Sequence, residues 1–126
     1  MQHRAALAWF DSVGDGEAVV CRVVQLGLLR HLTNPYILKD EVVSLSGAMA
    51  VWDHILRDRR IRFLVDEPPG LDRILRQSLV VRDAGHNVWT DAYLAAFAQA
   101  YSLKFATFDR GFRSFAGLDL VLLESS

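Results

Sequence analysis

The sequence predicts an α/β protein with a three-layer α/β/α architecture and a mostly parallel sheet. Two observations predict this class. Short apolar runs that fit buried strands recur along the chain, and longer segments with apolar residues at helical spacing separate them. Strands that alternate with helices are typical of a parallel sheet covered on both faces. We expect the strands at residues 18–21, 61–65, 105–108 and 118–123.

The expected helices follow from apolar stripes and from the residues that start or stop a helix. Ser44 can act as an N-cap, and Pro35 ends the preceding helix because proline disfavours the helical conformation in the residue before it. We expect Thr90 to cap a helix that begins at Asp91 and is apolar nearly all round. A loop is expected at residues 83–87, and a short turn or helix at 110–115. The longer helices are expected near residues 5–13, 25–33, 45–56, 71–79 and 91–101.

Composition favours one domain over residues 1–126, because the chain is 52% hydrophobic and long enough to bury a core. The 14 basic and 15 acidic residues nearly cancel, so net charge does not indicate a nucleic-acid partner. A single cysteine, Cys21, excludes an intrachain disulfide, and no apolar run resembles a secretion signal or is long enough to span a membrane. We therefore expect a cytoplasmic protein.

Two aspartates near the C-terminus are the strongest candidates for chemistry. Asp109 directly follows an expected strand, and ligands of open parallel sheets bind at the carboxyl ends of strands. Asp91 falls in the first turn of the preceding helix, which approaches the same edge. Two carboxylates with water suit Mg²⁺ or Mn²⁺, which prefer oxygen ligands. The pair therefore predicts half of a metal site.

Each aspartate also has a structural interpretation. An acidic residue in a first helical turn is stabilised by the helix dipole by about 0.3–1 kcal/mol, which explains Asp91 without a metal. Asp109 can cap the short helix that follows it. Their joint placement favours the functional interpretation, but both remain open at this point.

Other residues give weaker signals. Gln25 lies on an apolar helical face, where a buried amide needs hydrogen-bond partners, and we expect a structural amide there. Arg110 and Arg113 flank the second aspartate and can hold a phosphodiester backbone. Cys21 is expected to be an inert core thiol, and the histidines lack zinc-ligand spacing. The motifs of serine hydrolases, P-loop enzymes and dinucleotide enzymes are absent from the sequence.

The C-terminal segments 90–95, 106–112 and 115–118 resemble the signature of PIN-domain proteins, specifically VapC-type toxins of toxin–antitoxin systems. Residues 21–30 and 33–35 are similar to the second segment of one VapC subgroup. The resemblance implies a Mg²⁺- or Mn²⁺-dependent endoribonuclease that forms a homodimer and is restrained by a VapB-like antitoxin. Asp91 and Asp109 match two of the family's metal-binding acids, while Gln25 and Thr107 would orient ligands or water.

The sequence departs from the family pattern at three places. Gln25 stands where a glutamate is usual, and Gly111 stands where a further aspartate is often found. The first strand of the family, with its aspartate, is expected to be missing, because the chain starts at the following helix. The alternative to an enzyme is therefore a non-catalytic, degenerate PIN module that binds an antitoxin or a partner subunit.

Overall fold

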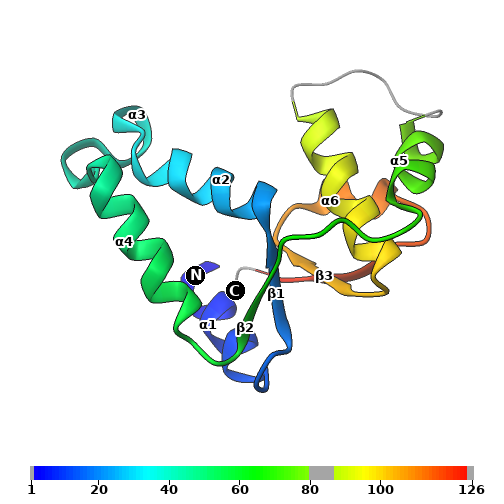
Figure 1. The fold of residues 1–126 in the computed structure, drawn as a ribbon, viewed down its shortest axis with the longest axis horizontal. Coiled ribbons are helices and arrows are strands. Elements are labelled where there is room, and N and C mark those ends of the chain that lie inside the picture. The colour runs from blue at the N-terminus through cyan, green and yellow to red at the C-terminus, as the bar shows by residue number, and fades with distance from the viewer. Residues whose placement is uncertain (1, 80–86, 125–126) are drawn as a thin grey trace. The chain divides into compact units, whose positions relative to one another are not determined.

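The computed structural model describes residues 2–79 and 87–124. Short strands alternate with helices along the chain, as the sequence predicts (Figure 1). The loop expected at residues 83–87 falls, except for Asn87, outside the described residues. The chain divides into two compact units, residues 1–9 with 66–126 and residues 10–65. The elements are α1 (Gln2–Asp11), β1 (Ala18–Cys21), α2 (Arg22–Leu32), α3 (Pro35–Leu38), η1 (Lys39–Glu41), α4 (Leu45–Leu56), β2 (Ile61–Leu64), α5 (Leu71–Leu79), α6 (Val88–Ala100), β3 (Lys104–Thr107), η2 (Arg110–Ser114) and β4 (Asp119–Leu122).

The unit of residues 10–65 is built on the parallel ladder of β1 and β2, in which Ala18 pairs with Ile61 and Cys21 with Leu64. Helix α2 starts directly after β1, and α2 and α4 pack against each other. Ser44 caps α4, as predicted, because its hydroxyl accepts a hydrogen bond from the backbone N–H of Gly47 at 3.0 Å. Because β1 ends at Cys21 and α2 begins at the next residue, the start of α2 lies at the carboxyl end of this parallel ladder.

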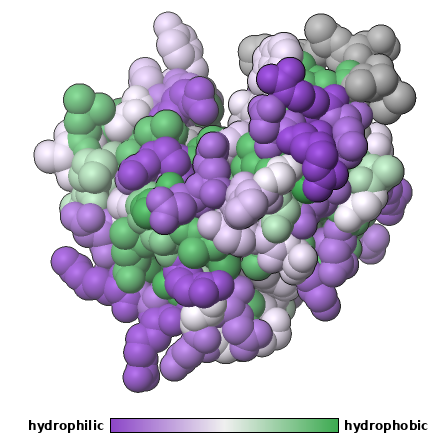
Figure 2. Space-filling model, turned by 45° about the vertical axis from the view of Figure 1, so that its right-hand side comes forward, coloured by the Kyte–Doolittle hydropathy of each residue, from purple (hydrophilic) through white to green (hydrophobic). Residues whose placement is uncertain are grey.

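The core of this unit contains Trp52 of α4, which is 3% exposed and contacts Phe63 of β2 edge to face. Cys21 is a buried free thiol, as expected. Hydrophobic side chains also lie among polar ones at the molecular surface (Figure 2). On α3 and α4, Tyr36 is 92% exposed and Leu45 is 79% exposed. Large apolar groups are thus available to solvent on this pair of helices.

The other unit is built on the parallel ladder of β3 and β4, in which Lys104 pairs with Asp119 and Thr107 with Leu122. Helix α6 packs against both α5 and β3. Small alanines of α6 let two aromatic side chains, one in η2 and one directly after it, approach closely. The buried members of this core are Ala92, Ala95, Phe112 and Phe115.

Helix α6 differs from its prediction. It begins at Val88, with Asn87 as the residue before it, so Thr90 lies inside the helix and is not its N-cap. The backbone N–H of Asp91 already donates to the carbonyl of Asn87 at 2.9 Å, which is a bond of the helical pattern. Asp91 nevertheless remains in the first turn. Within the described residues, none of the helices is long and apolar enough to cross a membrane.

Candidate metal centre

Asp109 is held in place by two short-range hydrogen bonds just beyond the end of β3. Its backbone N–H donates to the Thr107 hydroxyl at 3.1 Å, and its Oδ1 accepts from the backbone N–H of Gly111 at 2.8 Å. The residue is therefore the N-cap of η2, which confirms one of the two interpretations of the sequence. The capping bond occupies one carboxylate oxygen. Asp109 is exposed, so its carboxylate is accessible to solvent.

Asp91 reaches the same end of the unit through the turn that joins α6 to β3. The backbone N–H of Leu103 donates to Ala98 at 2.7 Å, and Ser102 adopts a left-handed conformation with φ of 57°. Because the turn is this short, β3 runs back along α6, and the start of α6 lies at the carboxyl end of β3. Asp91 is half-buried in that first turn.

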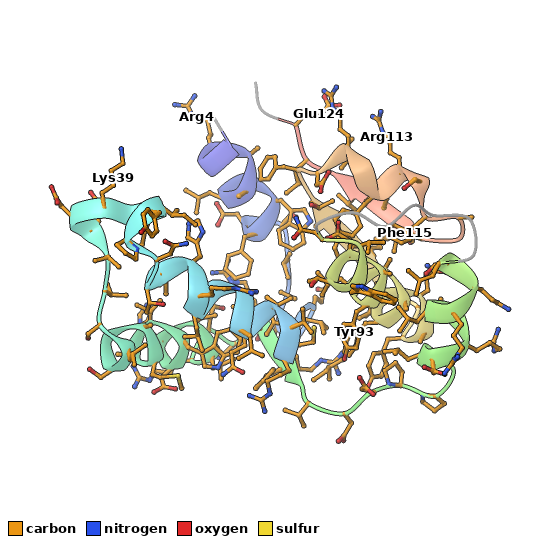
Figure 3. The ribbon with its side chains drawn as sticks, turned by 90° about the horizontal axis from the view of Figure 1, so that it is seen from above. Arg4, Lys39, Tyr93, Arg113, Phe115 and Glu124 are labelled. Atoms are coloured by element: carbon orange, nitrogen blue, oxygen red, sulfur yellow. The ribbon has the colours of Figure 1, made fainter. Side chains whose placement is uncertain are left out.

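Packing between α6 and η2 supports the same placement. Ala92, the residue after Asp91, lies in one buried cluster with Phe112, which is three residues after Asp109. The Phe112 ring is also 4.6 Å from that of Phe105 in β3, measured between centroids. Figure 3 shows Arg113 extending away from the η2 ribbon, and both Arg110 and Arg113 are exposed. The buried Phe112 thus anchors η2, which presents two cations to solvent beside Asp109.

The donor set fits a small divalent cation. Mg²⁺ is commonly bound by one or two carboxylates together with water and substrate phosphate, and Asp91 and Asp109 supply two carboxylates at one end of the unit. Across residues 2–79 and 87–124, no group of three or more histidine, cysteine, aspartate or glutamate side chains is gathered to hold a metal. A metal site among these residues would therefore rest on Asp91 and Asp109 as its acidic ligands.

Gln25 lies in the other unit, on α2, and is 6% exposed. Its Oε1 accepts a hydrogen bond from Nη1 of Arg22 at 2.5 Å. The expectation that this buried amide needs a hydrogen-bond partner is confirmed. Arg22 was not among the residues that the sequence singled out. The signal available was its position three residues before Gln25, a spacing at which helical side chains meet.

Residues 2–118 match the family model of the PIN domain. The chain therefore belongs to the PIN-domain family. It is 36% identical to Ribonuclease VapC41 from Mycobacterium tuberculosis strains CDC 1551 / Oshkosh and ATCC 25618 / H37Rv, over 127 aligned residues that cover 98% of this chain and 87% of the relative. The resemblance to VapC-type PIN proteins and the three-layer α/β/α fold class are confirmed by these matches.

Proposed function

We propose that residues 1–126 form a single PIN domain that acts as a divalent-metal-dependent endoribonuclease toxin, with Mg²⁺ or Mn²⁺ as its ion. The observation that supports the proposal is the buried cluster in which Ala92, the neighbour of Asp91, lies with Phe112, three residues after Asp109. The similarity to a protein named as a ribonuclease supports RNA as the substrate.

We assign parts in this function to six residues of the chain. Asp91 and Asp109 hold the cation, and Thr107 fixes the backbone of Asp109. A bound divalent cation supplies an activated water and stabilises the charge that develops on phosphate. Arg110 and Arg113 hold the RNA backbone through charge-assisted hydrogen bonds. Gln25 orients a neighbouring group and does not react, because an amide is neither an acid nor a base near neutral pH.

The proposal includes protein partners. A VapB-like antitoxin and a second copy of the chain are the expected ones, in the cytoplasm. Tyr36 and Leu45, the most exposed apolar side chains of α3 and α4, are the residues that we assign to this contact.

Cleavage of single-stranded RNA by the purified protein tests the function. We expect cleavage with Mg²⁺ or Mn²⁺, none with EDTA, and a loss of at least about 100-fold in Asp91→Asn and Asp109→Asn, comparable to the loss of a large electrostatic contribution to catalysis. Asp119→Asn is the matched control. Asp119 is exposed in the same unit, but it is the first residue of β4 and lies at the opposite end of the ladder from Thr107. It should cleave as the unmodified protein does.

The degenerate PIN module is the second candidate. Two observations favour it. Among the described residues, no group of three or more potential metal ligands lies together, and the Gln25 carbonyl oxygen already accepts a hydrogen bond from Arg22. If the folded protein binds antitoxin but cleaves no RNA with either metal, the module is correct and the enzyme is not.

A further inference from the structure

Arg22 lies at a place in the fold where ligands commonly bind. It is the first residue of α2 and directly follows Cys21, the last residue of β1. Cys21 pairs with Leu64, the last residue of β2, so Arg22 stands at the carboxyl end of this parallel ladder. In open α/β sheets, ligands bind outside the carboxyl ends of the strands.

The Arg22 guanidinium is fixed from two sides within residues 10–65. Gln25, which is 6% exposed, accepts its hydrogen bond at 2.5 Å. The guanidinium carbon lies 5.0 Å from the centroid of the Phe63 ring, within the range of a cation–π contact. Phe63 is itself held by buried Trp52, at 5.3 Å between centroids and 82° between planes. A chain of contacts therefore connects the core of the unit to an arginine that is exposed.

This arrangement gives Gln25 a different role from that of a metal ligand. Its carbonyl oxygen already faces a full positive charge, and a cation at the same oxygen would be repelled by the guanidinium. A glutamate at this position would form an ion pair and neutralise Arg22. A neutral amide holds the guanidinium in the same way but leaves its charge uncompensated.

We propose that Arg22 binds a phosphate of the RNA, and that Gln25 is its positioning residue. The proposal rests on the proposed function, because it takes RNA as the substrate. Arginine suits this task since its planar group offers five N–H donors in a fork that matches phosphate, and Gln25 accepts from one of them. Because Gln25 already fixes the guanidinium of Arg22, less conformational entropy is lost when the phosphate binds.

The test measures RNA binding without cleavage. Anisotropy of a labelled single-stranded RNA is followed across a range of KCl concentrations, in an Asp109→Asn background of the full chain that blocks turnover. Adding Arg22→Ala should weaken binding at least about tenfold and lower the salt slope by about 0.7, the value for one phosphate contact on a single strand. Arg22→Lys should keep much of the salt slope, because the charge remains.

Two further variants separate positioning from simple structure. Arg30→Ala is the matched control, since Arg30 is an exposed arginine in the last turn of the same helix, and it should bind as the background does. Gln25→Glu should weaken RNA binding although it adds an ion pair. If Gln25 were a metal ligand, Gln25→Glu in the otherwise unmodified protein would instead raise cleavage and tighten Mn²⁺ binding.

Each outcome decides the proposal. Unchanged affinity and salt slope in Arg22→Ala, or faster cleavage in Gln25→Glu, overturns it while the proposed function stands. If the unmodified chain neither binds nor cleaves RNA, both fail. Circular dichroism melts identify a variant that has lost its fold, and in that case Arg22→Lys and Gln25→Glu carry the decision.

Discussion

The Nη1 atom of Arg22 lies 2.5 Å from Oε1 of Gln25, so the buried amide of α2 is satisfied by the exposed arginine one turn before it. This contact has a consequence for stability that is separate from RNA binding. Leaving a buried polar group without a hydrogen-bond partner destabilises a protein by more than the net stabilisation that one hydrogen bond provides.

Replacing Arg22 should therefore destabilise the fold. We expect Arg22→Ala to lower the free energy of unfolding by about 1–3 kcal/mol, because Gln25 is left buried without this donor. Arg22→Ala combined with Gln25→Leu should recover part of the loss, since the buried amide is then gone. Urea unfolding of the single and double variants measures the coupling. If the losses in free energy of unfolding of the two single variants simply add in the double variant, the contact between Arg22 and Gln25 contributes nothing to stability.

Asp58 gives a prediction about pH. Hydrogen bonds from the side chain and backbone of Arg60 lower the pKa of the Asp58 carboxyl from its ordinary 3.8 to about 2. A lowered pKa in the folded state stabilises the protein above pH 4, and this contribution is lost as the pH falls toward 2. Asp58→Asn should therefore lower the melting temperature at pH 7, and the difference from the unmodified protein should shrink between pH 4 and 2.

Thermal melts followed by circular dichroism at several pH values measure that difference. Asp72→Asn is a useful comparison, because Asp72 also pairs with an arginine, Arg76, but both side chains are largely exposed. It should change the melting temperature little at any pH. A melting difference for Asp58→Asn that stays constant from pH 7 to 2 would contradict the assignment.

Two glycines should respond to alanine in opposite directions. Gly117 has φ of 84°, and an added Cβ would lie 3.1 Å from Oε1 of Gln99, so Gly117→Ala should cost about 1–2 kcal/mol. Gly27 lies inside α2, and an added Cβ would meet no heavy atom within 4 Å apart from its chain neighbours and the backbone of its own helix. Gly27→Ala should stabilise the protein by about 0.5–1 kcal/mol. Chemical denaturation compares the two, and equal signs would refute the backbone argument.

Periodicity and turn chemistry predict most of the fold. The strands expected at residues 105–108 and 118–123 are found as β3 and β4, each within one residue of its predicted ends, whereas the sequence did not predict which strands pair. Ser44 is recognisable as a cap from its position before an apolar stripe. The start of α6 was predicted three residues late. Thr90 has the chemistry of a cap, but the helix begins two residues earlier at Val88, and the Asp91 N–H makes an ordinary helical bond to the Asn87 carbonyl.

The candidate site is predictable to the extent that it is local in sequence. Asp109 follows a strand and caps η2, and both features are readable from residues 105–112. The part played by Arg22 is not, because it requires the Phe63 ring, which comes from a strand 41 positions away in the chain. Whether the amide oxygen of Gln25 bonds to Arg22 or to another group depends on side-chain direction and burial. The sequence pattern gives neither of these.

Binding of Mn²⁺ followed by electron paramagnetic resonance tests the central claim most directly, because it reads the ion itself. If Asp91 and Asp109 hold one cation, Asp91→Asn and Asp109→Asn should each lose most of the binding, and the double variant should lose little more, since the two effects are coupled through a shared ligand. Asp119→Asn should bind as the unmodified protein does. Single variants that retain full Mn²⁺ affinity, or losses that add independently, would contradict a shared metal site.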